Sequence, residues 1–316
     1  MFKFNKDILT NNYRISKLIQ YHNKREDYPL VDNKILTAKR AHSYQIPVPD
    51  NYFFIESHGE LRKKIDDFTH LPSSFVVKPA EGSQGGGILI VDKMIKSDNK
   101  DEVFFQTSRL GNLNTKEFKH YLSGILSGLY SLKGYKDFIL VQEKVTNIDT
   151  FQQVTDSGIP DIRVIVLLGY PIMSMIRFPT LLSGGRGNLH LGAVGSGIDL
   201  KTGKVFHSIQ NNRTIAQHPD SLFKLEGLSM PHWTAILELA ARSSEMARIG
   251  YLGVDIVVDL NKGPLLLEMN ARPGLSIQLA NQQGLKSVIN KVLKEAPKNL
   301  NYKDRVLWSQ NELYHR

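Results

Sequence analysis

Cysteine is absent from the 316 residues of this chain, which excludes disulfide bonds and thiolate catalysis. Long hydrophobic runs are missing as well, since no apolar stretch approaches the roughly 18–20 residues that a membrane-spanning helix requires. Residues 1–7 are interrupted by charge and lack the apolar centre of a signal peptide. From these absences we expect a cytoplasmic protein without a transmembrane segment.

Acidic residues are fewer than basic ones, 31 against 40, and the formal net charge is +9. Such a surplus can attract nucleic acid, anionic membranes or acidic substrates, or it can serve solubility and a polyphosphate site. The lysines and arginines are scattered, and no RNA-binding aromatic motif or base-reading helix is present. We therefore expect no specific nucleic-acid partner. A basic surface module for nucleic acid or membrane remains an alternative that would show steeply salt-dependent binding without ATP.

Helical and strand-like segments alternate along the chain without an internal repeat, and a hairpin is predicted about residues 169–171. This mixture favours an α+β fold over a doubly wound parallel sheet. Asp32 is expected to cap a helix over residues 32–44, and residues 92–114 are expected to form a loop or insertion. The expected divisions are an N-terminal extension (1–31), a first lobe (32–145), a second lobe (146–296) and a polar C-terminal tail (297–316).

A lysine at a strand end precedes a glycine-rich turn. Lys78 follows three apolar residues, and its ammonium group suits phosphate oxygens. Glycines in the turn allow backbone N–H groups to approach an anion. The members of the turn are Glu81, Gly82, Ser83, Gln84, Gly85, Gly86 and Gly87. The pattern differs from the G-x-x-x-x-G-K-S/T phosphate loop, and its alternative interpretation is a plain hairpin turn with a solvated lysine.

A second polar group follows the apolar residues 138–141. Its members are Gln142, Glu143, Lys144 and Val145. A strand that emerges from the core and ends in polar residues can offer adenine an acceptor for its amino group and a backbone donor for its ring nitrogen. The alternative is an ordinary strand end with charged residues.

The third group carries two carboxylates and an amide. Asp255 lies within an otherwise apolar strand, whereas Glu268 and Asn270 are two residues apart and so point to one face of the next strand. Charges in such strands are costly unless they are paired or bind a cation, and hard oxygen ligands suit magnesium. Arg272 follows on the same side, where it could clamp a phosphate or a carboxylate. The alternative is that Glu268 pairs with a basic side chain and Asp255 is a strand-edge charge.

Together these groups resemble the ATP-grasp superfamily, and within it the alpha-L-glutamate ligase group that includes the ribosomal-protein glutamate ligases. The resemblance covers residues from about 32 to about 285, and its most specific segments are residues 77–87, 141–143, 161–163, 187–190, 253–256 and 268–274. It implies an ATP-grasp fold, in which two α+β lobes hold ATP between them. The N-terminal pre-ATP-grasp domain would be largely missing, because only about thirty residues precede Lys34.

The resemblance also implies roles for individual residues. It assigns Lys34 and Lys78 to the phosphates together with the glycine-rich turn. It assigns adenine to Gln142, Glu143 and Val145, with Lys144 beside them, and the ribose to Asp161. The magnesium ligands that it implies are Asp255, Glu268 and Asn270.

Further residues of the same pattern concern the reacting groups. Arg163 would hold the phosphoryl group or the acyl phosphate, and Asn188 lies in a glycine-rich loop that would close over the site. His190 has a packing role or a substrate contact as equal alternatives. Arg272 occupies a position that is small in many glutamate ligases, whereas an arginine there is similar to carboxylase-type relatives.

The implied activity is that of an ATP-dependent carboxylate–amine ligase, which forms an amide through an acyl phosphate and releases ADP and phosphate. The implied cofactors are ATP and two Mg²⁺ ions, with Mn²⁺ as a substitute. The carboxylate donor would be an amino acid such as glutamate, and the amine acceptor a small molecule, a peptide or a protein. Family members are often homo-oligomers. The alternative hypothesis is a non-catalytic ATP-binding regulatory protein.

Overall fold

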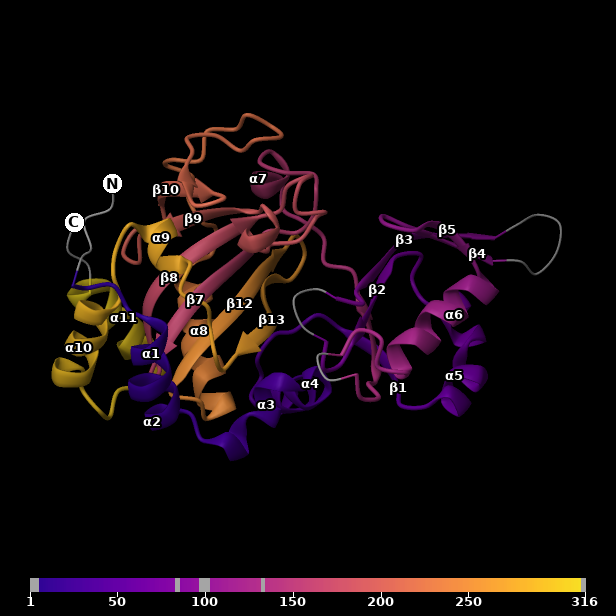
Figure 1. The fold of residues 1–316 in the computed structure, drawn as a ribbon, viewed down its shortest axis with the longest axis horizontal. Coiled ribbons are helices and arrows are strands. Elements are labelled where there is room, and N and C mark those ends of the chain that lie inside the picture. The colour runs from indigo at the N-terminus through magenta and orange to yellow at the C-terminus, as the bar shows by residue number, and fades with distance from the viewer. Residues whose placement is uncertain (1–5, 83–85, 97–102, 132–133, 314–316) are drawn as a thin grey trace. The chain divides into compact units, whose positions relative to one another are not determined.

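The computed structural model describes residues 6–82, 86–96, 103–131 and 134–313. The chain forms two compact units: unit 1 comprises residues 1–32, 40–48 and 145–316, and unit 2 comprises residues 33–39 and 49–144. Each unit contains an antiparallel sheet with helices packed on it (Figure 1). The α+β class predicted from the sequence is confirmed.

Unit 2 is built on a six-stranded sheet with the strand order β1-β6-β2-β3-β4-β5. Its strands are β1 (Asn51–Ile55), β2 (Phe75–Pro79), β3 (Leu89–Lys96), β4 (Val103–Thr107), β5 (Gly111–Asn114) and β6 (Ile139–Glu143). Its helices are α5 (His58–Lys64), the 3₁₀ helix η3 (Asp66–His70) and α6 (Thr115–Leu126), and helix α4 (Lys34–Ser43) begins in this unit.

The core of unit 2 follows from strand alternation. Phe75 and Val77 of β2 point to one face, where they meet Phe105 and Phe118 in a single hydrophobic cluster. The Phe105 and Phe118 rings stack with centroids 4.0 Å apart. Helix α6 begins at a capping box in which Asn114 and Glu117 satisfy each other's backbone N–H groups. The opposite face of β2 carries Val76 and Lys78.

Unit 1 is built on a seven-stranded sheet with the order β11-β10-β9-β8-β7-β12-β13. Its strands are β7 (Asp161–Leu167), β8 (Tyr170–Phe178), β9 (Val194–Ile198), β10 (Val205–Gln210), β11 (Arg213–Thr214), β12 (Tyr251–Asp259) and β13 (Gly263–Asn270). Its longer helices are α8 (Trp233–Ala247), α10 (Lys286–Glu295) and α11 (Tyr302–Glu312).

Short helical segments complete unit 1. Before the first sheet they are α1 (Asn11–Tyr13), the π helix η1 (Arg14–Ile19), α2 (Gln20–His22), η2 (Arg25–Asp27) and α3 (Pro29–Asp32). Later in the chain they are α7 (Asp149–Gln152), η4 (Leu189–Leu191) and α9 (Ile277–Asn281). In the described part of the chain, no helix is both long enough and apolar enough to cross a bilayer.

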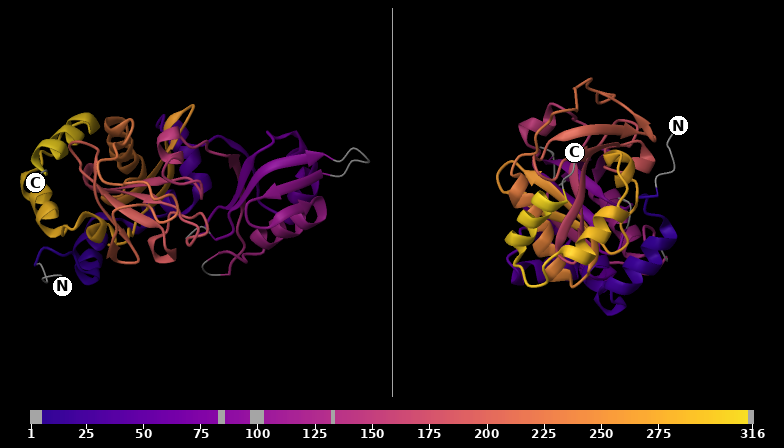
Figure 2. Two further views of the ribbon diagram at one scale, coloured as in Figure 1. Left: turned by 90° about the horizontal axis from the view of Figure 1, so that it is seen from above. Right: turned by 90° about the vertical axis from the view of Figure 1, so that its left-hand side faces the viewer.

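The two faces of the seven-stranded sheet differ in character. One face carries even-numbered residues of β7 and β12, such as Ile162 and Val254, which pack with helix α8. The other face carries odd-numbered residues, and its apolar half (for example Ile165 and Tyr251) packs with α9, α10 and the N-terminal helices. Figure 2 shows these N-terminal and C-terminal helices on unit 1. The remaining half of this face is polar.

Two local expectations need correction. Asn33, rather than Asp32, caps helix α4, because its Oδ1 accepts from the backbone N–H groups of Ile35 (3.0 Å) and Leu36 (3.1 Å). The expected loop over residues 92–114 instead contains the end of β3 and strands β4 and β5. Their apolar alternation is confined to short stretches, which explains why the pattern was missed.

The chain ends also carry more structure than expected. Residues 302–312 of the expected polar tail form helix α11, which begins at an Asn301 cap and buries Val306 in the core beside α8. The N-terminal extension contains the short helices α1, η1, α2, η2 and α3. A single buried apolar residue per helical turn is a weak signal in the sequence, and tertiary packing decides the outcome here.

Replacing Phe118 with alanine is expected to destabilise unit 2 by about 3–5 kcal/mol, because the ring is fully buried among other aromatic rings. The measurement is urea denaturation together with hydrogen exchange of the β2 and α6 amides. Lys116→Ala, an exposed change on the same helix, should stay within about 0.5 kcal/mol of the wild type. Equal stability of the two variants would contradict this packing.

Candidate functional site

Two acids and two arginines form a connected network on the polar half of the seven-stranded sheet. Arg163 donates from Nε to Oδ1 of Asp255 at 2.7 Å and from Nη2 to Oδ2 at 2.6 Å, a two-pronged contact. Arg177 donates from Nε to Asp161 at 2.6 Å and from Nη2 to Asp255 at 2.9 Å. Arg177 therefore links the two carboxylates. Asp161 is 6% exposed and Asp255 is 3% exposed.

Strand register explains why these four side chains meet. Asp161 lies opposite Arg177 across β7 and β8, and Arg163 lies opposite Asp255 across β7 and β12. Directly opposed residues share a face and have closely spaced Cβ atoms. Glu268 is in turn opposite Asp255 across β12 and β13. One row across three strands therefore runs from Arg163 through Asp255 to Glu268.

The two buried acids have different pKa values beside the guanidinium groups of Arg163 and Arg177. Burial alone would raise the pKa of Asp255, but the charges of Arg163 and Arg177 prevail and hold it at about 2. Burial raises the pKa of Asp161 to about 6, despite the opposing effect of Arg177, and the charge of Asp255 adds to the rise. Asp255 is therefore the more firmly ionised of the two acids.

The predicted magnesium ligands share this face. Asn270 is two residues from Glu268 and lies opposite Gly253, so Asp255, Glu268 and Asn270 present hard oxygen atoms on one side of the sheet. Asp255 Oδ1 accepts a hydrogen bond from Arg163, and Asn270 Oδ1 accepts one from the backbone N–H of Arg272. Each of these oxygens has a second lone pair. The donor set therefore fits a magnesium ion.

Clusters of histidine and carboxylate side chains could also mark a metal site. Among the residues that the structure describes, no three histidine, aspartate or glutamate side chains are grouped as a metal site. The predicted magnesium ligands are two carboxylates and one amide. The absence of a cluster of three histidine or carboxylate side chains therefore does not test them. The role of Asp255, Glu268 and Asn270 at magnesium stays a prediction.

Arg272 is held on two sides within unit 1. Its Nη2 donates to Oδ2 of Asp32 at 3.1 Å, and its guanidinium carbon lies 5.1 Å from the centre of the Tyr28 ring. The side chain is nevertheless 56% exposed. Arg272 is thus fixed at the surface, where it can still meet an anion.

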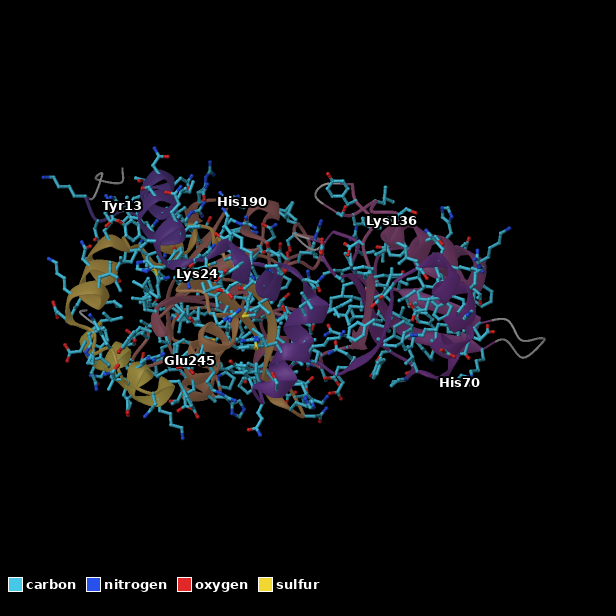
Figure 3. All side chains as sticks on the ribbon, turned by 90° about the horizontal axis from the view of Figure 1, so that it is seen from below. Tyr13, Lys24, His70, Lys136, His190 and Glu245 are labelled. Carbon is cyan, nitrogen blue, oxygen red and sulfur yellow. The ribbon has the colours of Figure 1, made fainter. Side chains whose placement is uncertain are left out.

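The glycine-rich loop after β8 packs closely on this network. A Cβ atom on Gly187 would lie 2.4 Å from Oδ2 of Asp161, so the close approach requires glycine. Asn188 caps the short helix η4 by accepting from the backbone N–H of His190 at 2.9 Å. His190 itself is exposed (Figure 3). The loop ends at strand β9, which begins at Val194.

A buried histidine anchors the start of the same loop. The Nε2 atom of His218 lies 3.0 Å from the carbonyl oxygen of Pro179, while the Asp220 N–H donates to Nδ1 at 3.4 Å. This arrangement assigns the proton of the neutral ring to Nε2. Burial lowers the pKa of His218, which keeps the ring neutral near neutral pH. Thr155 donates to the same carbonyl.

In unit 2, the described part of the glycine-rich turn is fixed by hydrogen bonds. Lys34 donates from Nζ to the carbonyl of Gly82 at 2.8 Å. The backbone N–H of Glu81 donates to Asp137 Oδ1 at 3.0 Å, and burial raises the pKa of that carboxyl group. Glu81 also accepts from Asn33 at 3.3 Å. Gly86 lies just past the gap, and the predicted residues Ser83, Gln84 and Gly85 lie outside the described residues.

Lys78 and Gln142 share the face of the six-stranded sheet that lies away from the aromatic cluster. Lys78 is opposite Leu140, and Val76 is opposite Gln142, which brings the lysine and the amide to one side. Lys78 is 7% exposed. Gln142 donates from Nε2 to Asn51 at 2.7 Å, whereas its buried Oε1 has no hydrogen-bond partner in the part of the chain that the structure describes. A buried acceptor of this kind fits the amino group of an adenine.

The remaining predicted adenine residues have different surroundings. Glu143 accepts from the backbone N–H of Asp50 at 2.9 Å, and Lys144 pairs with Asp92 at 2.6 Å. Val145 belongs to unit 1, where it packs with Val257. The chain therefore passes from one unit to the other directly after Lys144. The adenine and ribose roles of these residues and of Asp161 stay predictions.

Sequence reasoning missed two residues of these clusters. Arg177 joins both carboxylates of unit 1. The hairpin predicted about residues 169–171 would place it opposite Arg163, whereas the observed register places it opposite Asp161. Asp137 supports the glycine-rich turn of unit 2. It precedes an apolar strand by one residue, and no local pattern distinguishes it from a solvated acid.

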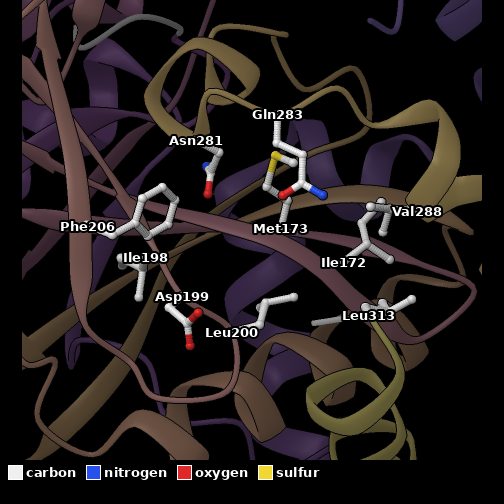
Figure 4. A pocket seen from close by; sticks show the side chains of 10 residues that line it. All are labelled: Ile172, Met173, Ile198, Asp199, Leu200, Phe206, Asn281, Gln283, Val288 and Leu313. Atoms are coloured by element: carbon white, nitrogen blue, oxygen red, sulfur yellow. The ribbon is translucent and has the colours of Figure 1, made fainter. Parts of the chain in front are cut away.

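A small pocket of about 40 Å³ lies elsewhere on unit 1 (Figure 4). It is lined by side chains from β8, β9 and β10 and from the C-terminal segments, among them Met173, Phe206, Asn281 and Val288. None of the predicted site residues lines it. The candidate site is consequently defined by the polar clusters and not by this pocket.

Acid should weaken unit 1 through His218. Because the folded-state pKa of His218 lies below its unfolded value of 6.5, its contribution to stability is present above pH 6.5 and is lost as the pH falls. Between pH 7.5 and 5.5, the wild type should lose up to about 1.4 kcal/mol more unfolding free energy than His218→Gln. Urea denaturation at the two pH values measures this difference, and parallel losses would contradict a buried neutral ring.

Comparison with known proteins supports one family. Residues 13–294 match the family model described as sugar-transfer associated ATP-grasp. A search among proteins of curated function gave no significant match. The match to the family model confirms the ATP-grasp superfamily predicted from the sequence, whereas the glutamate ligase group stays a prediction.

Two solved structures of low identity share the fold, and a third aligns with a TM-score under 0.5. Biotin carboxylase from Campylobacter jejuni, in a complex named for β,γ-ATP, is 12% identical with a TM-score of 0.51; the alignment covers 89% of this chain and 49% of that chain. Phosphoribosylamine–glycine ligase from Thermotoga maritima is 15% identical with a TM-score of 0.50, covering 92% and 62%. ATP-grasp ligase PsnB with a minimal precursor is 11% identical with a TM-score of 0.43, covering 85% and 64%.

The chain spans less than two thirds of the length of each of these three solved chains. The family match, in contrast, extends over most of the present chain. This protein therefore belongs to the sugar-transfer associated ATP-grasp family.

Proposed function

We propose that the protein is an ATP-dependent carboxylate–amine ligase that forms an amide bond through an acyl phosphate. The observation that carries the proposal is the polar half of the seven-stranded sheet. There, buried acids hold Arg163 and Arg177, and Glu268 lies opposite Asp255 on the neighbouring strand. Fixed cations beside hard oxygen ligands are what a transferring phosphoryl group and its metal require.

In the first step, a carboxylate oxygen of the donor substrate attacks the γ-phosphorus of ATP. A bond forms between that oxygen and phosphorus, the bond from phosphorus to the β,γ-bridging oxygen breaks, and ADP leaves. Arg163, oriented by its two contacts with Asp255, would neutralise charge on the moving phosphoryl group. Lys34 and Lys78 would bind phosphate oxygens.

In the second step, an amine nitrogen attacks the acyl carbon. The carbon–nitrogen bond forms, the carbon–oxygen bond to phosphate breaks, and the amine releases its proton to water or to the departing phosphate. This chemistry depends on position and charge more than on a strong base. Closure of the glycine-rich loop containing Asn188 would exclude water that could hydrolyse the acyl phosphate.

Asp255, Glu268 and Asn270 would bind Mg²⁺, whose chemical contribution is to neutralise phosphate oxygens. Asp255 suits this role because its low pKa keeps it ionised. Gln142 would accept from the adenine amino group through its buried Oε1. Two metal ions, or manganese in place of magnesium, belong to the same proposal.

The substrates are proposed by class. An amino acid such as glutamate is one candidate donor, and an amine on a small molecule, peptide or protein is the acceptor. The family description, associated with sugar transfer, makes sugar acids and amino sugars further candidates. A substrate panel should pair each carboxylate with each amine.

Amine-dependent ADP release over this panel tests the proposal. Asp255→Asn and Glu268→Gln should reduce the rate at least about a hundredfold, because each removes charge beside the phosphoryl group. Glu226→Gln serves as the matched control, since Glu226 is an exposed acid of the same unit, and it should retain the wild-type rate. Circular dichroism should show that the variants remain folded.

Two outcomes would contradict the assignment. Undiminished turnover in both site variants would remove these acids from the mechanism. Tight, magnesium-dependent ATP binding without ADP release for any pair of substrates would instead favour the non-catalytic ATP-binding protein. Titration calorimetry with ATP, run beside the activity assay, distinguishes these results.

A further inference from the structure

The residues ahead of helix α4 pack into unit 1 as a structured segment. We call residues 6–32 the N-terminal strap. Leu9, Leu18 and Ile19 of the strap are buried in the hydrophobic cluster that covers the apolar half of the odd-numbered sheet face. Figure 3 shows the strap along unit 1, with Tyr13 and Lys24 labelled. The strap thus shares a face of the sheet with the Asp255 network.

The backbone of the strap is fixed by side chains from far along the chain. Gln278 donates from Nε2 to the carbonyl of Leu9 at 3.1 Å and accepts from the Leu9 N–H at 2.8 Å. Asp7 accepts from the backbone N–H and the hydroxyl of Ser287. The buried Leu9–Gln278 bonds and the exposed Asp7–Ser287 bonds together give the strap one defined path over the unit.

Asn23 connects the strap to both ends of the β12–β13 hairpin. Its Nδ2 donates to the carbonyls of Tyr251 and Ala271, both at 2.8 Å, and its Oδ1 accepts from the Tyr251 N–H at 2.8 Å. Every hydrogen of this amide is therefore used. Ala271 directly follows Asn270, so the contact fixes the backbone where the predicted magnesium strand ends.

The two residues after Ala271 are held by the strap as well. Arg14 donates from Nη1 to the carbonyl of Pro273 at 2.6 Å. Asp32 accepts from the Arg272 guanidinium at 3.1 Å, and the ring of Tyr28 lies beneath it at 5.1 Å. Three consecutive residues, 271–273, are thus each bound by a different part of the strap.

This short loop also contacts the candidate site itself. The Arg272 N–H donates to Oδ1 of Asn270 at 2.8 Å. A Cβ on Gly253 would lie 2.8 Å from Pro273, so the loop lies close against strand β12 next to Asp255. A displacement of residues 271–273 would therefore change the position of the Asn270 side chain.

We propose that the N-terminal strap contributes to substrate binding at the site. Tyr28 and Asp32 are positioning residues that orient the Arg272 guanidinium, two residues after Asn270, toward an anionic group of the substrate. Arg14 and Asn23 fix the backbone that carries Arg272. The inference rests on the proposed ligase function, because it assigns the exposed Arg272 side chain to a substrate of that reaction. A guanidinium that is already oriented loses less freedom when it binds a carboxylate or phosphate.

The first test needs no turnover. Hydrogen exchange of the amides in residues 270–275 is compared among the wild type, Arg14→Ala, Tyr28→Leu and Asp32→Ala. Exchange should become at least about threefold faster in these variants, because each loses one contact to the loop. Two matched controls should exchange like the wild type: Tyr28→Phe, which keeps the ring under Arg272, and Glu26→Ala, an exposed strap acid that pairs only weakly with Lys24 at 3.9 Å.

The second test separates positioning from stability. With the anionic substrate identified in the panel, Tyr28→Leu and Asp32→Ala should raise its KM about fivefold or more, the equivalent of about 1 kcal/mol. The KM for ATP and the value of kcat should change less than twofold in these variants. The control Tyr28→Phe should keep the wild-type KM for the anionic substrate. Equal changes in both KM values would overturn the proposal, since a merely structural strap affects both substrates.

The two tests separate this inference from the ligase proposal. If no substrate pair gives ADP release, the proposed function fails, and the exchange of residues 270–275 alone decides whether the strap fixes the loop. Unchanged exchange in all three strap variants overturns the inference even if the enzyme proves to be a ligase.

Discussion

The polar half of the seven-stranded sheet depends on one requirement: buried charges must be paired. Asp255 and Asp161 are almost fully buried, and Arg163 and Arg177 supply the compensating charges. Removing a single partner from such a network leaves an unpaired buried charge and typically costs about 3–5 kcal/mol. The arginines are thereby held in fixed positions on the sheet. Phosphoryl transfer requires cations in fixed positions. The contacts that stabilise the sheet are therefore the same contacts on which the proposed chemistry depends.

Much of this arrangement follows from alternation and register. The sequence alone predicted the hairpin of β7 and β8, the strand of Asp255 and the shared face of Glu268 and Asn270. The opposition of Asp161 and Arg177 does not follow from the turn alone, because Leu167 pairs with Tyr170 and an irregularity between Ile165 and Val166 then shifts the register by one residue. The ATP-grasp superfamily could also be predicted, because its motifs are contiguous segments of the sequence. Residue roles remain predictions, since neither a fold nor a motif fixes what a side chain contacts in the presence of a ligand.

Other features depend on contacts between distant segments. The strap is polar and its helices are short, yet Asn23 and Gln278 give it a defined path through bonds that span more than two hundred residues. Helix α11 and strands β4 and β5 also depend on burial that local periodicity does not reveal. Asn33 rather than Asp32 caps α4 because the helix begins at Lys34, two residues after the start of the predicted helix. Such outcomes are decided by tertiary packing, which short windows of sequence do not contain.

A crystal structure with magnesium and a non-hydrolysable ATP analogue would decide the roles of these residues. We expect Glu268, Asn270 and Asp255 to bind the metal, Arg163 and Lys78 to contact the terminal phosphate, and Gln142 to accept from the adenine amino group. A nucleotide bound without contact to any of these groups, or a metal held by other residues, would contradict these expectations.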